Sequence, residues 1–277
     1  MPMQAVSYTA QWTAAARALE TELGEHASFA DPYARALAVP RGFELLEKNR
    51  GGGLIPFIAI RTRFLDETIE SVLRDNDIRQ IVFIAAGMDT RAFRLDWPSD
   101  AVVYEVDFPG LLEEKRRRLA ELNATPRVRR REVAADLRGE WLPDLERSGF
   151  DRTAPTLWIT EGLLFFLTPE QATGLLSTLA SASAPGSWLG VDFVSQALLR
   201  SPFSREFRRN LEDDGTPWLF GTDEPEEYLA SIGWKAREVK EPGEPGTAHE
   251  DWPFEVQPRD RRGPSRSWLV RAEFSGQ

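Results

Sequence analysis

The stretch from Ile81 to Thr90 is the first part of this sequence that indicates ligand chemistry. Its apolar run is followed by Ala86 and Gly87, small residues that let a backbone approach a ligand at the edge of a sheet. Asp107 ends a second β-rich run 20 residues after Gly87. A carboxylate at this spacing accepts hydrogen bonds from ribose hydroxyls in Rossmann-type sites, so the pair predicts nucleoside binding. The alternative for Asp107 is a strand-end turn or a helix cap.

The loop after this run argues against a dinucleotide. A pyrophosphate needs a glycine turn and a helix N-terminus, but Ala85 replaces the first glycine and no third glycine follows Gly87. Asp89 stands where the phosphates would lie, and like charges repel. S-adenosylmethionine has no phosphate and carries an ammonium and a sulfonium group, which suit an acidic loop. We therefore expect this cofactor and disfavour an NAD-linked dehydrogenase.

Two further carboxylates follow predicted strands. Asp136 could accept a hydrogen bond from an adenine amino group while the backbone N–H of Leu137 serves a ring nitrogen. The alternative for Asp136 is a helix cap or a turn. Glu161 lies between apolar residues, where a carboxylate is costly unless it is paired. The cationic end of the cofactor would be a suitable partner.

Arg61 lies on the apolar face of a predicted helix, 54–76. The apolar face of this helix consists of Ile58, Leu65, Ile69 and Val72, which recur at helical spacing. An inward arginine requires an anion, and the carboxylate of the methionyl group fits its planar fork. The alternatives are an internal salt bridge to Glu161 or Asp89, and extension of the side chain to solvent.

The elements that must position these residues alternate between strand and helix. We expect parallel strands at 81–85, 102–107, 128–135, 156–160 and 188–193, with helices at 108–123 and 169–183 between them. A helix at about 223–232 precedes two late strands, 234–240 and 267–274. A loop without a crossover helix joins these strands, so they should pair antiparallel. The pattern predicts an α/β fold with a doubly wound sheet.

We expect one domain over residues 1–277. Residues 1–76 are predicted to form a helical cap over the ligand edge of the core, 77–277, and the segment 195–222 is predicted to be a lid insertion. Both should close over the substrate. The aromatic residues there could line an apolar pocket for a ring-bearing molecule; they are Tyr8, Trp12, Phe203, Phe207, Trp218 and Phe220.

Five short motifs resemble, in order and spacing, the leucine carboxyl methyltransferase-like family of S-adenosylmethionine-dependent methyltransferases. They are 60–64 (Ile-Arg-Thr-Arg-Phe), 86–95 (Ala-Gly-Met-Asp-Thr-Arg-Ala-Phe-Arg-Leu), 106–107 (Val-Asp), 135–137 (Ala-Asp-Leu) and 161–164 (Glu-Gly-Leu-Leu). That family includes enzymes that methylate the C-terminal leucine carboxylate of a protein phosphatase, and bacterial relatives that act on polyketide carboxylic acids.

The resemblance implies a Rossmann-like class I methyltransferase with a seven-stranded sheet and an antiparallel last strand. It implies that Arg61 holds the cofactor carboxylate, that Ala86 and Gly87 approach the methionyl part, and that Asp107 binds the ribose. It further implies that Asp136 and Leu137 bind adenine and that Glu161 binds the cationic amino-acid end. The phosphatase enzymes have a basic residue upstream of Asp-Pro-Tyr, but there is no lysine or arginine near His26. This difference favours the bacterial small-molecule branch.

Composition limits the other possibilities. The net charge of −10 argues against nucleic acid as a partner, and no apolar run is long enough to span a membrane. The sequence has no cysteine and its N-terminus does not resemble a secretory signal, so we expect a soluble, cytoplasmic protein with a small-molecule partner. Neither histidine lies in a ligand-spaced cluster, and no metal is expected. The oligomeric state is left open.

The expected reaction is methyl transfer to a carboxylate of a small natural-product acid, as in secondary metabolism. A carboxylate is already ionised at neutral pH, so no general base is required and no catalytic residue is assigned. The first alternative is a phenol or hydroxyl acceptor, for which His249 is the candidate base. The second is a module that binds S-adenosylmethionine without turnover.

Overall fold

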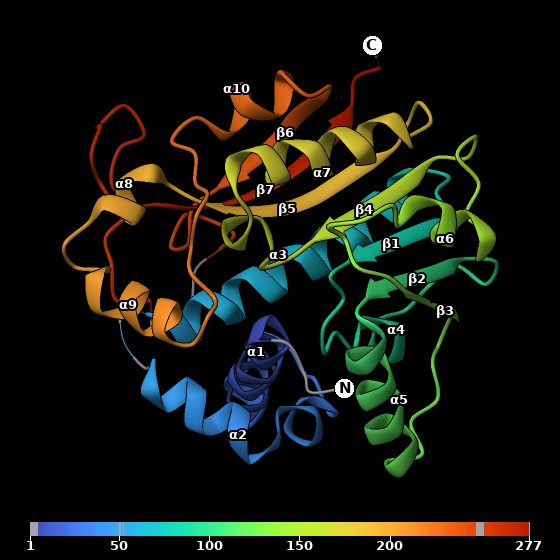
Figure 1. Ribbon diagram of the computed structural model, residues 1–277, viewed down its shortest axis with the longest axis horizontal. Coiled ribbons are helices and arrows are strands. Elements are labelled where there is room, and N and C mark those ends of the chain that lie inside the picture. Colours follow the sequence, from blue (N-terminus) through green and yellow to red (C-terminus); the bar gives the residue numbers. More distant parts are fainter. Residues whose placement is uncertain (1–4, 50, 52, 248–251, 277) are drawn as a thin grey trace.

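The computed structural model describes residues 5–49, 51, 53–247 and 252–276. Its centre is a seven-stranded sheet with the order β3-β2-β1-β4-β5-β7-β6 (Figure 1). The neighbours from β3 to β5 run parallel, whereas β7 pairs antiparallel with both β5 and β6. The expected doubly wound, Rossmann-like sheet with an antiparallel last strand is confirmed. The strands are β1 (Gln80–Ile84), β2 (Val102–Asp107), β3 (Arg129–Ala134), β4 (Thr156–Thr160), β5 (Trp188–Val194), β6 (Trp234–Lys240) and β7 (Ser267–Phe274).

Side-chain alternation along the strands separates two hydrophobic cores. In β1, Ile81 and Phe83 point to one face of the sheet, while Val82 and Ile84 point to the other. The first core is covered by α3, α4 and α5 together with α1 and α2, and the second by α6, α7 and α10. The strand order reverses between β1 and β4, which opens a crevice at their carboxyl ends.

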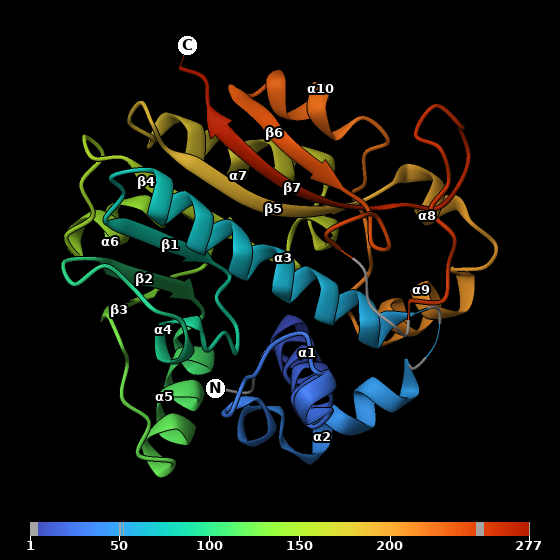
Figure 2. The same cartoon turned by 180° about the vertical axis from the view of Figure 1, so that it is seen from behind.

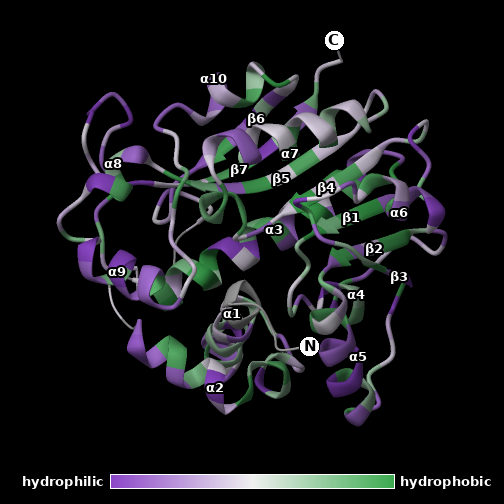
Figure 3. Cartoon of the chain, in the orientation of Figure 1, coloured by the Kyte–Doolittle hydropathy of each residue, from purple (hydrophilic) through white to green (hydrophobic). Residues whose placement is uncertain are grey.

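Ten α-helices and two short 3₁₀ helices are found in the described residues. Figure 2 shows α3 crossing the rear face of the sheet, and Figure 3 shows apolar residues gathered in the strands. The helices are α1 (Ala5–Thr21), η1 (Gly24–His26), α2 (Ala34–Lys48), α3 (Leu54–Asp75), α4 (Arg91–Arg94), α5 (Pro109–Glu121), α6 (Leu142–Arg147), η2 (Leu164–Phe166), α7 (Pro169–Ser181), α8 (Gln196–Arg200), α9 (Arg205–Asp213) and α10 (Pro225–Ala230). None of the described helices is long and apolar enough to cross a membrane.

The helix α3 packs on the sheet itself, unlike α1 and α2, with which it shares the predicted cap region. Its apolar stripe, which includes Leu65 and Ile69, is buried in the first core. Gly190 of β5 allows the close approach, because a Cβ atom there would lie 2.9 Å from Ile159 Cδ1 and 3.0 Å from Leu65 Cδ2. The helix thereby holds Arg61, one turn before Leu65, against the sheet.

The helices α1 and α2 pack together at the carboxyl edge of the sheet. Gly42 permits their close crossing, because a Cβ atom there would lie 2.5 Å from the backbone oxygen of Gln11. The segment 195–222, which contains α8 and α9, contacts α1 through Trp12 and Phe207, whose ring centroids are 6.3 Å apart. Lys48 of α2 bonds both carboxylate oxygens of Asp214 at 2.8 Å.

We predict that Gly190→Ala destabilises the protein by roughly 1–3 kcal/mol, because the added methyl group overpacks the contact between α3 and β5. Gly174→Ala is the control, since a Cβ atom at that helical position meets nothing within 4 Å. It should stabilise by roughly 0.5–1 kcal/mol. Denaturant unfolding of both variants measures the difference, and equal stabilities would contradict this packing.

Candidate cofactor site

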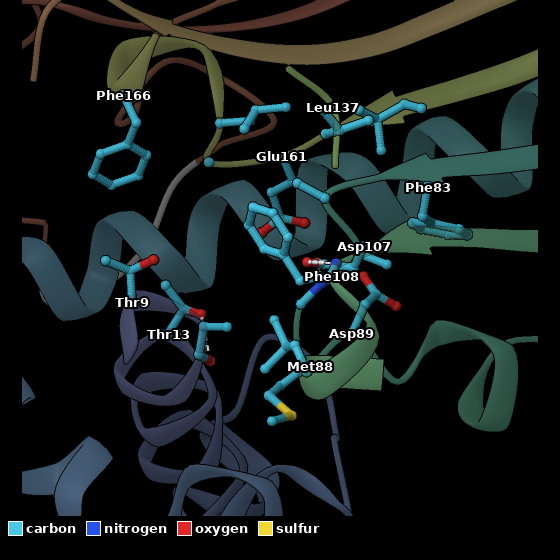
Figure 4. A pocket seen from close by; sticks show the side chains of 18 of the residues that line it. Thr9, Thr13, Phe83, Met88, Asp89, Asp107, Phe108, Leu137, Glu161 and Phe166 are labelled. Carbon is cyan, nitrogen blue, oxygen red and sulfur yellow. Dashed lines mark hydrogen bonds between the residues drawn. The ribbon is translucent and has the colours of Figure 1, made fainter. Parts of the chain in front are cut away.

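A cavity of about 290 Å³ lies at the carboxyl ends of β1, β2 and β4. All seven residues that the sequence assigns to the cofactor line this cavity, although they come from separate parts of the chain. They are Arg61, Ala86, Gly87, Asp107, Asp136, Leu137 and Glu161. Asp107, Leu137 and Glu161 are labelled in Figure 4. The fold therefore brings the complete predicted set to one place.

The loop after β1 makes a left-handed turn toward the cavity. Ala85 has φ 55° and Gly87 has φ 51°, a region that favours glycine. The backbone N–H of Ala86 donates to Val106 O at 3.1 Å, which fixes the turn against β2. A Cβ atom at Gly87 would lie 3.1 Å from Ala10 Cβ, so α1 packs directly over the loop.

Asp107 is held by two backbone donors at the end of β2. Its Oδ2 accepts the N–H of Gly87 and its Oδ1 accepts the N–H of Phe108, each at 2.7 Å. Burial raises the pKa of Asp107, and these two hydrogen bonds oppose the rise. Each oxygen keeps a lone pair, so the fixed carboxylate can accept further hydrogen bonds from a ligand.

Asp136 and Leu137 lie in a turn after β3. Asp136 accepts hydrogen bonds from the backbone and side chain of Arg138, and the side-chain bond lowers the pKa of Asp136. This is the turn that the sequence allows as an alternative. The backbone N–H of Leu137 donates to no acceptor in the described part of the chain, so it can donate a hydrogen bond to a ligand.

Glu161 follows β4 and pairs with two arginines. Its Oε1 accepts Arg61 Nε at 3.0 Å and its Oε2 accepts Arg91 Nη1 at 2.7 Å. Burial opposes ionisation, but the two guanidinium groups lower the pKa of Glu161 to about 2. Arg61 also donates through Nη1 to Asp192 at 3.0 Å. The internal salt bridge considered for Arg61 is thus present.

Arg91 extends this ion network to the glycine loop and to α3. It is 2% exposed, donates to Asp66 Oδ1 at 2.6 Å and also bonds Asp89. Arg94 completes the network through Asp66. The connected ion pairs join three arginines to four carboxylates, so their formal sum is one negative charge beside the cavity.

Sequence reasoning missed several residues of the site. Asp192 gave no signal, because it stands inside an apolar strand and far from Arg61 in the chain. Arg17, Thr9 and Thr13 line the cavity from one face of α1, and their spacing of four residues could have revealed that face. Arg17 donates to Met88 O at 2.6 Å and to Asp31 at 3.0 Å, which ties α1 to the loop after β1.

The predicted aromatic residues lie in different places. Trp12, Phe207 and Trp218 form a chain of ring contacts that reaches Phe165, the neighbour of the cavity residue Phe166. Phe203 is 97% exposed, and Phe220 packs in the second core. The side chain of Tyr8 is outside the described part of the structure.

No histidine is found among the described residues that line the cavity. His26 is exposed in η1, and His249 lies outside the described residues. Among the residues that the structure describes, no group of three or more His, Cys, Asp or Glu side chains could hold a metal ion.

Comparison with known proteins identifies the family of this chain. The leucine carboxyl methyltransferase family matches the chain over residues 10–180, which include all seven predicted cofactor residues. The chain belongs to this family. A protein from Mycobacterium sp. (strain JLS) is 38% identical over 258 residues, covering 86% of this chain and 85% of its own. It carries the provisional name of an S-adenosyl-L-methionine-dependent methyltransferase.

Two crystal structures share the fold of this leucine carboxyl methyltransferase family member. One is a provisionally named methyltransferase from Thermobifida fusca, with a TM-score of 0.61 and 19% identity, covering 87% of this chain and 92% of that one. The other is a DUF574 family protein from Streptomyces avermitilis, with a TM-score of 0.60 and 18% identity, covering 94% and 96%. The protein is an S-adenosylmethionine-dependent methyltransferase, as the sequence predicts.

The charges of the cavity fit S-adenosylmethionine. The ion network has one unbalanced negative charge, and the cofactor has an ammonium group to balance it. Asp107 and Leu137 offer an acceptor and a donor at separate points of the same cavity, as a nucleoside requires. The donor set therefore suits a nucleoside with a zwitterionic amino-acid tail.

We predict that Asp107→Asn weakens binding of S-adenosylmethionine and S-adenosylhomocysteine by about 10- to 150-fold, the equivalent of roughly 1.5–3 kcal/mol. The amide has one acceptor oxygen, so it cannot receive both backbone N–H groups and a ribose hydroxyl. Calorimetry measures the dissociation constants. Asp96→Asn is the control, because Asp96 is fully exposed and pairs with Arg127 away from the cavity. An unchanged constant in folded Asp107→Asn would contradict the assignment.

We predict that Glu161→Gln lowers the free energy of unfolding at pH 7 by roughly 3–5 kcal/mol, because Arg61 and Arg91 lose a buried charge partner. The pKa of Glu161 is lowered from 4.5 to about 2, so its stabilising effect is complete above pH 4.5 and is lost as pH falls toward 2. In denaturant unfolding, the difference in the free energy of unfolding between wild type and Glu161→Gln should shrink over that pH range.

Glu67→Gln is the control. It breaks an exposed pair with Arg63 and should change stability by less than about 1 kcal/mol.

Proposed function

We propose that this methyltransferase transfers a methyl group to a carboxylate oxygen of a small-molecule acid. The observation that supports the proposal is which types of side chain line the cavity. Among its described residues there is no histidine, lysine, cysteine or tyrosine, which are the usual groups for removing a proton near neutral pH. An acceptor that arrives ionised needs no such group, and a carboxylate with a pKa of about 4 meets this condition.

Two acidic residues of the cavity, Glu161 and Asp107, are poorly placed to act as general bases. Glu161 has a pKa of about 2 and both its oxygens are engaged by arginines, so it has little tendency to accept a proton. Asp107 is fixed by two backbone hydrogen bonds at the place proposed for the ribose, away from the proposed acceptor. A hydroxyl acceptor would have to be deprotonated, and these groups are unsuited to that task. The chemistry of the wall therefore favours an acid over a phenol.

The proposed placement of the cofactor follows the donors and acceptors already described. Asp107 accepts the ribose hydroxyls, and Asp136 with the backbone N–H of Leu137 recognises adenine. Ala86 and Gly87 border the methionyl chain, whose ammonium faces Glu161. Arg61 binds the methionyl carboxylate through Nη2, since its Nε and Nη1 are engaged by Glu161 and Asp192. When bound, the cofactor supplies an activated methyl group on its sulfonium.

The acceptor then occupies the end of the cavity formed by Thr9, Thr13 and Phe166. In Figure 4 these side chains lie apart from Asp107 and Leu137, with Glu161 between the two groups. Phe166 offers an apolar face at this end, where the Thr13 hydroxyl already donates to Ala10 O at 3.0 Å. The protein's contribution is to align the acceptor oxygen and to exclude water, which is catalysis by proximity. The cavity of about 290 Å³ has to hold the cofactor as well as the acceptor, which favours a small acid.

We predict that labelled methyl groups from S-adenosylmethionine are transferred to members of a panel of aryl and alkyl carboxylic acids, and not to the matching phenols and alcohols. Turnover should not fall between about pH 8 and 6, because a carboxylate stays ionised there. The product should be a methyl ester, which mild alkali hydrolyses. His26→Ala and His249→Ala should leave the rate nearly unchanged.

Two results would give different answers. An alkali-stable product whose formation depends on a histidine and falls at low pH would establish a hydroxyl acceptor instead. Binding of S-adenosylmethionine without transfer to any acceptor class would favour a binding module. Folded Asp107→Asn, assayed with subsaturating cofactor, is the inactive reference that separates enzymatic transfer from spontaneous methylation.

A further inference from the structure

The turn after β3 contains an ion pair at the edge of the cofactor cavity. Arg138 binds the carboxylate of Asp136 through Nε at 2.9 Å and through Nη2 at 2.6 Å, and both residues line the cavity. The guanidinium carbon of Arg138 also lies 6.0 Å from the centroid of the Phe108 ring, which is another cavity residue. One side chain thus contacts both the carboxylate and an aromatic face.

These two contacts are the ones an adenine ring would make. A guanidinium group is planar and presents N–H donors along its edge, as the amino group of adenine does, and it stacks on aromatic faces. We propose that the Arg138 side chain occupies the adenine subsite from within and is displaced when the cofactor binds, so that Arg138 sets cofactor affinity. The inference rests on the proposed placement of adenine beside Asp136.

The turn can release the side chain without losing its shape. The backbone N–H of Arg138 donates to Asp136 Oδ1 at 3.0 Å, and the backbone N–H of Gly139 donates to Asp136 O at 2.9 Å. Neither bond involves the guanidinium group. The Asp136 carboxylate therefore stays in position, and displacement frees Oδ2 for a base amino group while Oδ1 keeps the backbone N–H of Arg138.

The energy of the ion pair limits the size of the effect. The side chains of Arg138 and Asp136 are 61% and 42% exposed. An exposed pair of this kind corresponds to about a 1.5- to 5-fold change in a binding constant. Salt screens exposed pairs, so the competition should weaken as ionic strength rises. Arg138 is thus expected to tune affinity within this range.

The test measures the dissociation constant of S-adenosylhomocysteine by calorimetry for wild type, Arg138→Gln, Asp136→Asn and the double variant. At low salt, about 50 mM, Arg138→Gln should bind about 2- to 5-fold more tightly than wild type, and at about 0.5 M the two should converge. In the Asp136→Asn background, Arg138→Gln should give no gain, because the competing bond is already lost. The control is Arg147→Gln, which breaks a pair with Asp144 of similar exposure, 69% and 40%, and should leave affinity unchanged.

Other results would overturn the inference. Weaker binding by Arg138→Gln would mean that Arg138 contacts the bound cofactor, and equal binding at every salt concentration would mean that it does not compete. If Asp136→Asn alone leaves affinity unchanged, the placement of adenine is wrong. The experiment uses no methyl acceptor, so a failure of the carboxylate proposal would appear only in the transfer assay and would leave this result standing.

Discussion

The buried ion network around Arg91 and Arg61 is the interaction on which the site depends. Charges removed from water destabilise a fold unless partners satisfy them, so the arginines and carboxylates must be in place together. The partners belong to α3, to the loop after β1, to the end of β4 and to the middle of β5. Four segments far apart in the chain are thereby held in one geometry at the carboxyl edge of the sheet.

The network also explains how the described wall of the cavity is charged although it has no histidine or lysine. Glu161 faces the cavity, but its two arginines keep it ionised far below neutral pH. The same pairing leaves one carboxylate charge in excess, which attracts a cationic ligand and suits binding better than proton transfer. Asp107 adds a second fixed carboxylate, oriented by the N–H groups of Gly87 and Phe108. The cavity wall is therefore organised for positioning, and the reactive bond belongs to the cofactor.

Much of this arrangement was predictable because its signals are local. The strands Trp234–Lys240 and Ser267–Phe274 match their predicted bounds, and Gly87 and Asp107 meet because parallel strands end at the same edge. The apolar stripe of α3 placed Arg61 inward. The partner Asp192 could not be predicted, since a single acid within an apolar strand has no pattern. The outward position of Phe203 depends on the path of the chain between α8 and α9, which composition does not determine.

The packing of α1 has a consequence for how this chain is divided. Ala10 lies against Gly87, and Thr9, Thr13 and Arg17 line the cavity, so the first helix is a wall of the candidate cofactor cavity. The helix precedes the sheet by some 60 residues, and a boundary drawn where the strand-helix alternation begins would exclude it. A shortened protein made on that boundary would keep every strand and still lose one side of its reaction chamber. The same boundary would also remove the buried faces of α1, α2 and α3 from the first core, so the packing of the sheet and the wall of the cavity depend on the same N-terminal helices.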